Sequence, residues 1–349
     1  MGVRCCKGAS RAPISLGMSK IIVVTGGAGF IGSNILAGLE ARGGARLVCC
    51  DVFGDTDKWR NVSKRLLHDI VTPERLESWL ASSDGAEVGA IVHMGARSDT
   101  TARDVDAVIA QNFAFSRMLW TWASRRDVAF VYASSAATYG NGEQGFDDDG
   151  SPEALAKLRP LNPYGWSKHL FDRFVAAEVA AGRRRPPQWA GLKFFNVYGP
   201  NEYHKGAQRS VAHQIHPVAA RGDAFALFKS HRPGIDDGGQ LRDFVWVGDC
   251  VHVTLWLLAN PHVSGLFNIG SGRARSFLDM ARAVYAACDR NASIVFRDMP
   301  EELRAHYQYY TKARLDRLRA VGYAWPFTEL EDGVARYVRG HLAAADPYI

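Results

Sequence analysis

Short apolar runs alternate with amphipathic stretches along the first 200 residues of the chain. Runs rich in β-branched residues predict buried strands at 21–25, 46–51, 90–93 and 129–134. Apolar positions at helical spacing predict helices at 33–42 and 112–125. A longer helix is expected after Lys168, and the apolar run 191–199 predicts the next strand. Strands that alternate with helices predict a parallel sheet with right-handed crossovers, and hence a doubly wound α/β fold of the Rossmann type.

The pattern loosens beyond residue 200. Glycine, proline and charged residues cluster at 201–206 and again at 230–241, and the second cluster predicts a surface loop or insertion. Residues 242–247 and 265–269 predict two further strands, with a helix between them that begins at Gly248. The C-terminal end is expected to be helical.

This change of pattern suggests how the chain is divided. We expect a nucleotide-binding Rossmann domain at 20–199 and a smaller, partly interleaved lobe at 200–349. The smaller lobe is expected to pack over the sheet edge and to supply substrate contacts. Residues 1–19 are expected to be a disordered extension or an over-extended start, because Met18 opens the sequence MSKIIVVTGG directly before the first strand.

Composition and charge fit a globular protein that binds a small molecule. Of the 349 residues, 47% are hydrophobic and 22% are charged, which is the usual range for soluble domains. The formal charge of +6 is spread along the chain, so it predicts no nucleic-acid surface, although it suits an anionic small substrate. No apolar stretch approaches the roughly 20 residues that span a bilayer, so no membrane partner is expected.

Cysteine usage predicts a reducing, cytoplasmic compartment. The six cysteines form two adjacent pairs and two single positions without a CxxC spacing, namely Cys5, Cys6, Cys49, Cys50, Cys250 and Cys288. Neither a disulfide framework nor a zinc site has this spacing. We therefore expect free thiols and no structural metal.

The stretch TGGAGFIG predicts a dinucleotide-binding loop. Gly26, Gly29 and Gly32 follow an apolar strand and lead into a predicted helix. Glycine lets such a loop turn tightly, brings the backbone close to a pyrophosphate, and packs the helix against the strand. Asp51 ends the next strand, where an acidic side chain is placed for the adenosine ribose.

The residues near this loop leave open whether NAD or NADP binds. A carboxylate such as Asp51 ordinarily favours NAD, because it accepts from a free 2′-hydroxyl and repels a 2′-phosphate. Lys58 and Arg60 follow closely and would neutralise a phosphate there. Asp69 is a candidate for the adenine edge, and the Gly-Ala step in VHMGARS predicts a place where the backbone passes close to the cofactor.

A phenol, an ammonium and a hydroxyl are predicted to meet at one edge of the sheet. Tyr164 and Lys168, in NPYGWSK, share a helical face because they are four residues apart. Ser135 ends a buried strand at the carboxyl edge, where open α/β sheets bind ligands. Tyrosine, with a pKa of about 10, is a poor base, and Lys168 beside a positive nicotinamide ring should lower that pKa. Tyr164 would then take a proton from an alcohol as hydride leaves the same carbon.

Several motifs together resemble the extended short-chain dehydrogenase/reductase superfamily, namely TGGAGFIG, SSAATYG, YGWSK and FFNVYGP. The likeness covers nearly the whole chain from Lys20, and most members act on nucleotide-linked sugars. Within the superfamily, the segments GARSDTTARD, NPYGWSKHLFD, FNVYGPNEYHKG and RDFVWVGD resemble the ADP-L-glycero-D-manno-heptose 6-epimerase family. That family inverts C6 of an ADP-linked heptose for bacterial lipopolysaccharide. The resemblance implies a tightly held NADP, removal of hydride and its return to the other face, and a homo-oligomer.

The resemblance also implies a second acid–base residue, because inversion needs proton transfer on both faces of a ketone. In the family the lysine of the HKG motif serves the face opposite the tyrosine, and Lys205 occupies that position here. The likeness assigns further cofactor contacts to Phe30, Ile31, Met94, Gly95, Ala96, Ser98, Asn112 and Val197. It assigns substrate contacts to Ser135, Asn196, Lys205, Ala207, Gln214, Phe228, Arg242 and Tyr307, with Arg242 at the diphosphate.

Three features depart from the family pattern. The segment 230–241 is longer than the family version, Ala207 stands where serine is expected, and Val52 stands where asparagine is expected after the strand-two acid. These departures leave the reaction class intact and bear on the substrate details and the cofactor phosphate.

Rival functions make different demands on the same residues. A UDP-glucose 4-epimerase shares the serine, tyrosine and lysine but has no need of Lys205, since its ketone rotates to present the other face to one base. A sugar-nucleotide 4,6-dehydratase requires an Asp-Glu pair just after a threonine in this region, and Ala136 and Ala137 before Thr138 argue against it. A non-catalytic NADP-binding module predicts a broken trio, whereas all three residues are present.

Overall fold

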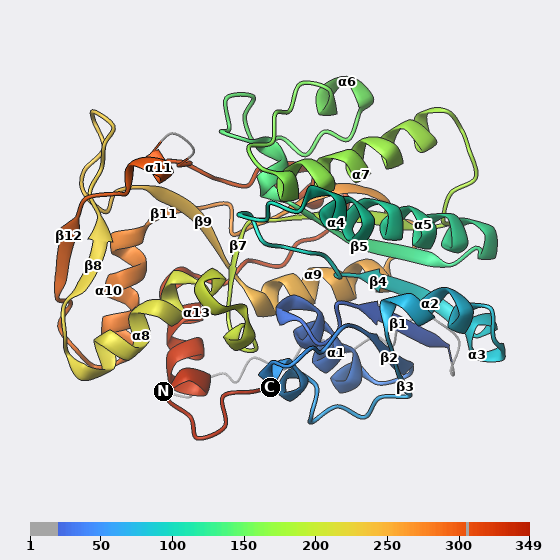
Figure 1. Ribbon diagram of the computed structural model, residues 1–349, viewed down its shortest axis with the longest axis horizontal. Coiled ribbons are helices and arrows are strands. Elements are labelled where there is room, and N and C mark those ends of the chain that lie inside the picture. Colours follow the sequence, from blue (N-terminus) through green and yellow to red (C-terminus); the bar gives the residue numbers. More distant parts are fainter. Residues whose placement is uncertain (1–19, 305–306) are drawn as a thin grey trace, which may run out of the picture.

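A parallel sheet of seven strands forms the centre of the molecule (Figure 1). The computed structural model describes residues 20–304 and 307–349, so the prediction for residues 1–19 lies outside the described residues. In spatial order the strands are β10 (Gly265–Ile269), β6 (Trp189–Phe194), β5 (Ala129–Ser135), β4 (Val88–His93), β1 (Ile21–Thr25), β2 (Arg46–Cys50) and β3 (Asp69–Val71). Every neighbouring pair is parallel, which confirms the predicted Rossmann-type fold.

Two apolar layers enclose this sheet. Successive strand residues point to opposite faces, so Ile22 and Val24 pack on one side and Ile21 and Val23 on the other. The first layer is covered by α1 (Phe30–Arg42), α9 (Val247–Ala259) and α12 (Asp316–Ala320). The second is covered by α2 (Pro73–Leu80), α5 (Phe115–Arg126) and α7 (Pro163–Ala180). Short helices in the connections are α3 (Ser83–Ala86), α4 (Val105–Ile109) and α6 (Pro152–Leu155).

Two small sheets and four helices form the second part of the molecule, at the left of Figure 1. One sheet joins β11 (Ala274–Ser276), β9 (Leu241–Trp246) and β7 (Asn196–Tyr198), and the other pairs β12 (Ile294–Arg297) with β8 (Phe225–Phe228). The helices are α8 (Val211–Arg221), α10 (Phe277–Ala287), α11 (Glu301–Arg304) and α13 (Leu330–Tyr337). Residues of α8, α10 and α13 share a third apolar core.

The predicted strand 191–199 is wrong as one element, because it contributes to two sheets. The chain leaves the large sheet after Phe194, and β7 then pairs with β9. At the break, the Phe195 backbone N–H donates to the Ile269 carbonyl over 3.0 Å. Strand β10 and helix α9 return from the C-terminal half to the large sheet, so the two parts of the chain interleave. The division near residue 200 therefore stays a proposal about organisation.

The helix predicted from residue 112 begins differently. Residues Ala110–Ala114 form a π-helical turn that links α4 to α5. Asn112, in this turn, is fully buried, and its side chain bonds both backbone groups of Arg97, at 2.7 and 3.0 Å. The wider turn thus places an amide where it holds the segment after β4.

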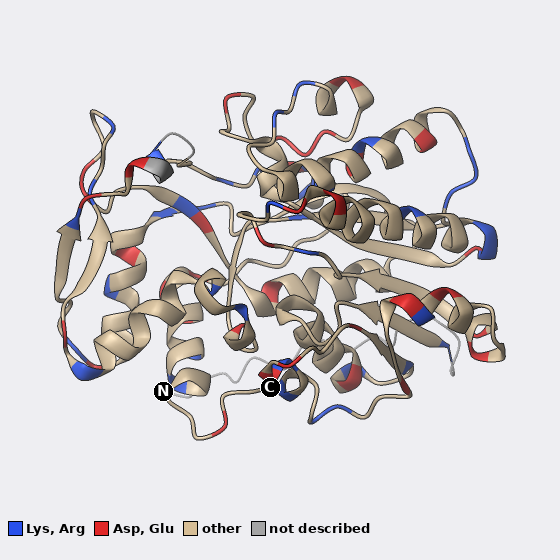
Figure 2. Cartoon of the chain, in the orientation of Figure 1, with Lys and Arg blue, Asp and Glu red and all other residues tan. Residues whose placement is uncertain are grey.

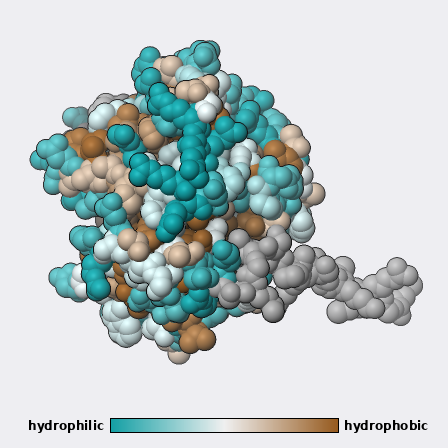
Figure 3. All heavy atoms as spheres, turned by 90° about the vertical axis from the view of Figure 1, so that its right-hand side faces the viewer, coloured by the Kyte–Doolittle hydropathy of each residue, from teal (hydrophilic) through white to brown (hydrophobic). Residues whose placement is uncertain are grey.

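The surface and the cysteines agree with a globular chain. Charged residues of both signs are spread over the elements (Figure 2), and the side seen in Figure 3 mixes hydrophilic residues with small apolar patches. Among residues 20–304 and 307–349, no helix combines the length and apolar character that a membrane span requires. Cys49, Cys50 and Cys250 are buried free thiols. Residues 229–240 connect β8 to β9 without regular structure, as predicted.

Candidate active site

A cavity of about 430 Å³ opens at the carboxyl edge of the large sheet. It lies where the strand order reverses between β1 and β4, the usual ligand position in open α/β sheets. The lining includes these residues selected from the sequence: Gly26, Gly29, Phe30, Ile31, Gly32, Asp51, Lys58, Met94, Gly95, Ala96, Ser98, Ser135, Tyr164, Lys168, Val197 and Lys205. The residues expected to bind the cofactor and those expected to transfer protons therefore line the same cavity.

The glycine-rich loop has no room for side chains. Gly26 has φ of +65°, and a Cβ there would lie 2.6 Å from the Gly95 backbone nitrogen. A Cβ on Gly32 would lie 2.1 Å from the carbonyl oxygen of Gly26. Helix α1 starts directly after Gly29, so its first backbone N–H groups are available to an anion at the cavity wall. The loop fits the pyrophosphate of a dinucleotide.

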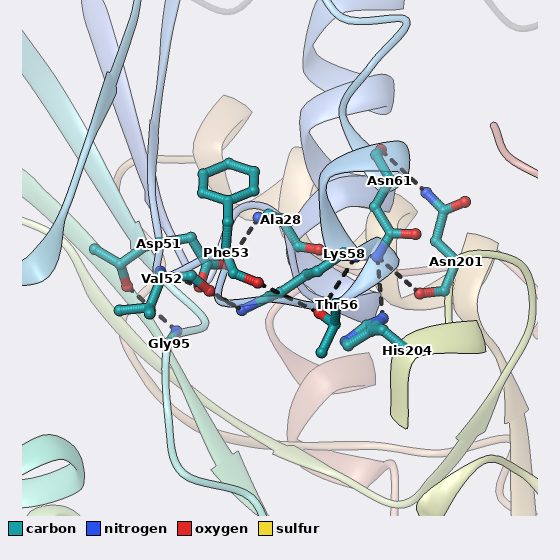
Figure 4. A network of polar contacts seen from close by, with 11 residues as sticks. Ala28, Asp51, Val52, Phe53, Thr56, Lys58, Asn61, Gly95, Asn201 and His204 are labelled. Atoms are coloured by element: carbon teal, nitrogen blue, oxygen red, sulfur yellow. Dashed lines mark hydrogen bonds and ion pairs between the residues drawn. The ribbon is translucent and has the colours of Figure 1, made fainter. Parts of the chain in front are cut away.

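Asp51 is fixed in place by two backbone donors and a cation (Figure 4). Its carboxylate accepts from the N–H of Ala28 at 2.8 Å and from that of Val52 at 2.7 Å. The Lys58 ammonium lies 2.5 Å from the same carboxylate and also donates to the Val52 carbonyl at 3.0 Å. Arg60 turns outward, where it pairs with Asp57 at 3.3 Å. Lys58 thus offsets the negative charge at the expected ribose position.

The first turns of α7 carry Tyr164 and Lys168 into the cavity. Asn162 caps this helix by accepting from the Gly165 N–H at 2.8 Å, and the Lys168 ammonium donates to the Ala133 carbonyl at 2.8 Å. Burial lowers the pKa of Lys168 to about 8, while the Asp172 carboxylate opposes that shift.

The pKa of Tyr164 moves opposite to the sequence-based expectation. Burial raises this pKa, because it removes water from the phenolate, and the hydrogen bond with Ser135 only partly opposes the rise. The residues of the chain by themselves therefore do not supply the expected lowering.

Lys205 reaches the same cavity from a different part of the chain. It lies in the 3₁₀ segment Tyr203–Gln208, and its Nζ lies 5.6 Å from the centre of the Phe30 ring. Burial lowers the pKa of Lys205, and the buried Glu202 carboxylate opposes the shift. A lysine with a lowered pKa gives up its proton more readily than an exposed lysine.

Two of the proposed cofactor residues lie outside the cavity lining. Asp69 accepts from the indole N–H of Trp79 at 2.8 Å. Asn112 is buried and donates to the Ser167 hydroxyl at 2.9 Å. It also bonds the backbone of Arg97, so it holds the segment that follows β4. Neither position shows a direct contact with the cavity.

The other residues proposed for the substrate lie in three different places. Asn196, Ala207 and Gln214 are exposed, and none of them lines the cavity. Arg242 is buried, and its guanidinium lies 5.2 Å from the centre of the Tyr307 ring. A second cavity of about 690 Å³ is lined by Tyr307 together with Asn141, Leu161, His231, Arg232, Pro233, Arg304 and Tyr309. Phe228 ends β8 beneath the Arg297 guanidinium.

Six lining residues were not selected from the sequence, namely Ala133, Ser134, Phe194, Phe195, His204 and Gln208. His204 precedes Lys205 in the HKG motif, and that adjacency was the signal available for it. Within the described part of the chain, no cluster of His, Cys, Asp and Glu side chains is arranged to hold a metal ion.

Known proteins resemble this chain over nearly its full length. A curated ADP-L-glycero-D-manno-heptose-6-epimerase of Fusobacterium nucleatum is 42% identical over 336 residues, covering 94% of this chain and 100% of the relative. One of Nitratidesulfovibrio vulgaris is 46% identical over 328 residues, covering 94% and 99%.

Solved structures resemble the fold. The Helicobacter pylori ADP-L-glycero-D-manno-heptose-6-epimerase has a TM-score of 0.77 at 24% identity, covering 94% of this chain and 97% of that one. The Thermus thermophilus UDP-glucose 4-epimerase in complex with NAD has a TM-score of 0.71 at 22% identity, covering 93% and 100%. The sequence profile of the NAD dependent epimerase/dehydratase family matches residues 22–270. With its glycine-lined dinucleotide cavity and its full-length relatives, the chain belongs to the NAD dependent epimerase/dehydratase family.

Proposed function

We propose that this protein is an ADP-heptose 6-epimerase, which converts ADP-D-glycero-β-D-manno-heptose to the L-glycero epimer by transient oxidation at C6. The observation that carries the proposal is a single cavity lined by the glycine-rich loop, by Tyr164 with Ser135 and Lys168, and by Lys205. The names of relatives at 42% and 46% identity support the choice of sugar nucleotide.

Two proton-transfer groups divide the work in this proposal. A bound nicotinamide dinucleotide supplies a hydride acceptor that can return the hydride to the same carbon. Tyr164 takes the C6 hydroxyl proton on one face, and the Ser135 hydroxyl bonds the same oxygen. The charge of Lys168 would favour the phenolate only together with the positive nicotinamide ring of a bound dinucleotide, because the residues of the chain by themselves do not lower the pKa of Tyr164. Because the hydride acceptor would stay on one side, the C6 ketone must turn over in the cavity before the hydride returns. Lys205 would then give a proton to the ketone oxygen on the second face, which yields the other epimer.

We propose NADP as the preferred cofactor. Lys58 forms an ion pair with Asp51 at 2.5 Å, which reduces the repulsion that a bare carboxylate would exert on a 2′-phosphate. NAD is the alternative. Denaturing the purified protein and measuring the mass of the released dinucleotide separates the two, and a dinucleotide without a 2′-phosphate would exclude the NADP assignment.

We also propose that Arg242 recognises the diphosphate of the substrate. Its guanidinium is buried, lies over the rings of Phe277 and Tyr307, and has its pKa lowered by burial. An anionic group would offset the cost of burying this charge, and a guanidinium pairs with phosphate through two hydrogen bonds. The other substrate contacts proposed are Asn196, Ala207, Gln214, Phe228 and Tyr307.

The setting of the reaction is proposed from the same likeness. We place the enzyme in the cytoplasm, as a homo-oligomer that supplies L-glycero heptose for lipopolysaccharide. Light scattering coupled to size-exclusion chromatography would measure the oligomer, and a monomer at micromolar concentration would contradict this part.

The function is tested by giving the purified protein ADP-D-glycero-β-D-manno-heptose without added cofactor and following the configuration at C6 by NMR. We expect inversion in the native protein and loss of most turnover in Tyr164→Phe and Lys205→Ala, with the dinucleotide still bound. Lys20→Ala is the matched control, because Lys20 is exposed at the opposite end of β1. Failure to invert C6 together with turnover of UDP-galactose would assign the protein to the 4-epimerases instead.

A further inference from the structure

Asn61 joins three segments at the wall of the cavity (Figure 4). It ends the 3₁₀ turn Asp57–Asn61 and is only 1% exposed. Its side-chain Nδ2 lies 2.8 Å from the Ala28 carbonyl in the glycine-rich loop, 3.0 Å from the Asn201 carbonyl and 3.1 Å from His204 Nδ1. One amide group therefore links the cofactor loop to the segment that carries Lys205.

Asn201 reinforces the same junction. Its backbone has φ of +71°, a left-handed conformation that is uncommon outside glycine and that asparagine adopts more readily than most residues. Its side chain donates to the Ser33 hydroxyl on α1 at 3.0 Å, and the residue is fully buried. The segment before Lys205 is thus bonded to both the loop and the helix that form the dinucleotide site.

The ring of His204 is neutral and lies against the Asn61 amide. Burial, followed by the charges of Lys58 and Lys205, lowers the pKa of His204 to about 4, so its ring is neutral at physiological pH. Asn61 Nδ2 lies 3.1 Å from His204 Nδ1, a contact in which Nδ1 accepts when the ring proton is on Nε2. His204 lines the cavity, so its ring contributes to the wall that a bound dinucleotide meets.

We propose that Asn61 is a positioning residue that holds the segment from Asn201 to Lys205 against the glycine-rich loop, so that His204 and Lys205 remain at the cavity while the dinucleotide is bound. The role of Lys205 in this inference rests on the proposed function. The retention of the dinucleotide does not, because it depends only on the two walls staying together.

Dissociation of the dinucleotide in the absence of any sugar tests the inference directly. The protein is loaded with the reduced dinucleotide and diluted into excess oxidised dinucleotide, and release is followed by the change in fluorescence of the reduced form. Asn61→Ala removes the donor shared by three acceptors, and we expect release about tenfold faster, equivalent to about 1.4 kcal/mol. Equal release rates for the native protein and Asn61→Ala would overturn the inference.

Gln188→Ala is the matched control. Gln188 is also 1% exposed, and its Nε2 lies near three backbone carbonyls, those of Leu257, Asn260 and Val263, at 2.6, 3.1 and 3.3 Å. It precedes β6, at the end of the sheet opposite the cavity. Both variants lose a buried amide, and only Asn61→Ala is expected to release the dinucleotide faster. Equal acceleration in both would mean a general loss of stability and would refute the positioning role.

Substitutions at His204 provide a second arm that does not depend on folding of Asn61→Ala. His204→Asn places an acceptor near the position of Nδ1 and should retain slow release, whereas His204→Leu loses one of the three contacts of Asn61 and should accelerate release by less than Asn61→Ala does. Fast release from both His204 variants, or from neither, would contradict the proposed contact.

The pH profile of turnover gives a further readout for Lys205. Its pKa is lowered by burial, so loosening of the segment should move the limb of the profile that reports Lys205 to higher pH. If the native protein retains its dinucleotide but does not invert the heptose, the proposed function is refuted. The inference about Asn61 is then decided by the release rates alone.

Discussion

A buried ion pair lies next to the elements that carry the proposed catalytic residues, and removing its cation should destabilise the protein strongly. Lys193 on β6 and Asp172 on α7 have no exposed side-chain surface, and their charged atoms lie 2.7 Å apart. Lys193 also donates to the Thr138 hydroxyl at 2.8 Å. Asp172 lies one helical turn beyond Lys168, and its carboxylate accepts from Ser134, the neighbour of Ser135, at 2.7 Å.

The cost of Lys193→Met follows from what remains after the substitution. The Asp172 carboxylate would keep only two neutral donors, the hydroxyls of Ser134 and Tyr132 at 2.7 and 3.1 Å. Breaking a buried pair in this way typically costs about 3–5 kcal/mol, because one charge is left unpaired without water. Removing the second charge as well, in Lys193→Met/Asp172→Asn, should recover a large part of that loss.

Urea denaturation at neutral pH of both single variants and the double variant measures this coupling as a double-mutant cycle. Arg184→Ala is the control, because Arg184 and Asp127 form a pair at 3.0 Å whose side chains are 60% and 70% exposed. Such a surface pair contributes about 0–1 kcal/mol. A loss below about 1 kcal/mol for Lys193→Met, or a double variant whose loss equals the sum of the two singles, would refute the reasoning from burial.

Three further outcomes are expected. Burial lowers the pKa of His93 from 6.5 to about 3, so its contribution to stability is complete above pH 6.5 and falls as the pH drops toward 3. In acid unfolding, the native protein should therefore lose about 2 kcal/mol more than His93→Gln by pH 5. Gly32→Ala should abolish dinucleotide binding in purified protein, whereas Gly340→Ala, with nothing within 4 Å of its added Cβ, should retain it. Lys58→Ala should reduce the preference for NADP over NAD by about tenfold in competition binding, and an unchanged preference would contradict the role of the Lys58–Asp51 pair.

Features with a local signature could be predicted from the sequence. The three-residue spacing of glycine predicts a tight turn at Gly26, Gly29 and Gly32. The four-residue spacing likewise predicts that Tyr164 and Lys168 share a helical face. The alternation of apolar runs likewise predicts the parallel sheet, because strand and helix periods differ.

Features that depend on distant pairs could not be predicted in this way. Asn61 and His204 are 143 residues apart, and nothing in the sequence around Asn61 indicates its partner. Lys193 follows the pattern of an ordinary strand residue, and only the fold reveals Asp172 beside it. The rise that burial causes in the pKa of Tyr164 could not be predicted for a related reason, since burial is a property of the whole packed site.

The return of β10 to the large sheet limits how a chain of this kind can be recombined. Helix α9 and strand β10 separate two stretches of the smaller lobe, and α12 separates the second stretch from α13. A lobe from a relative with another sugar preference therefore cannot be transplanted as one cassette. Exchange would need matched junctions at Phe195 and Trp246, where the chain passes between layers, which favours stepwise divergence of individual loops over wholesale domain shuffling.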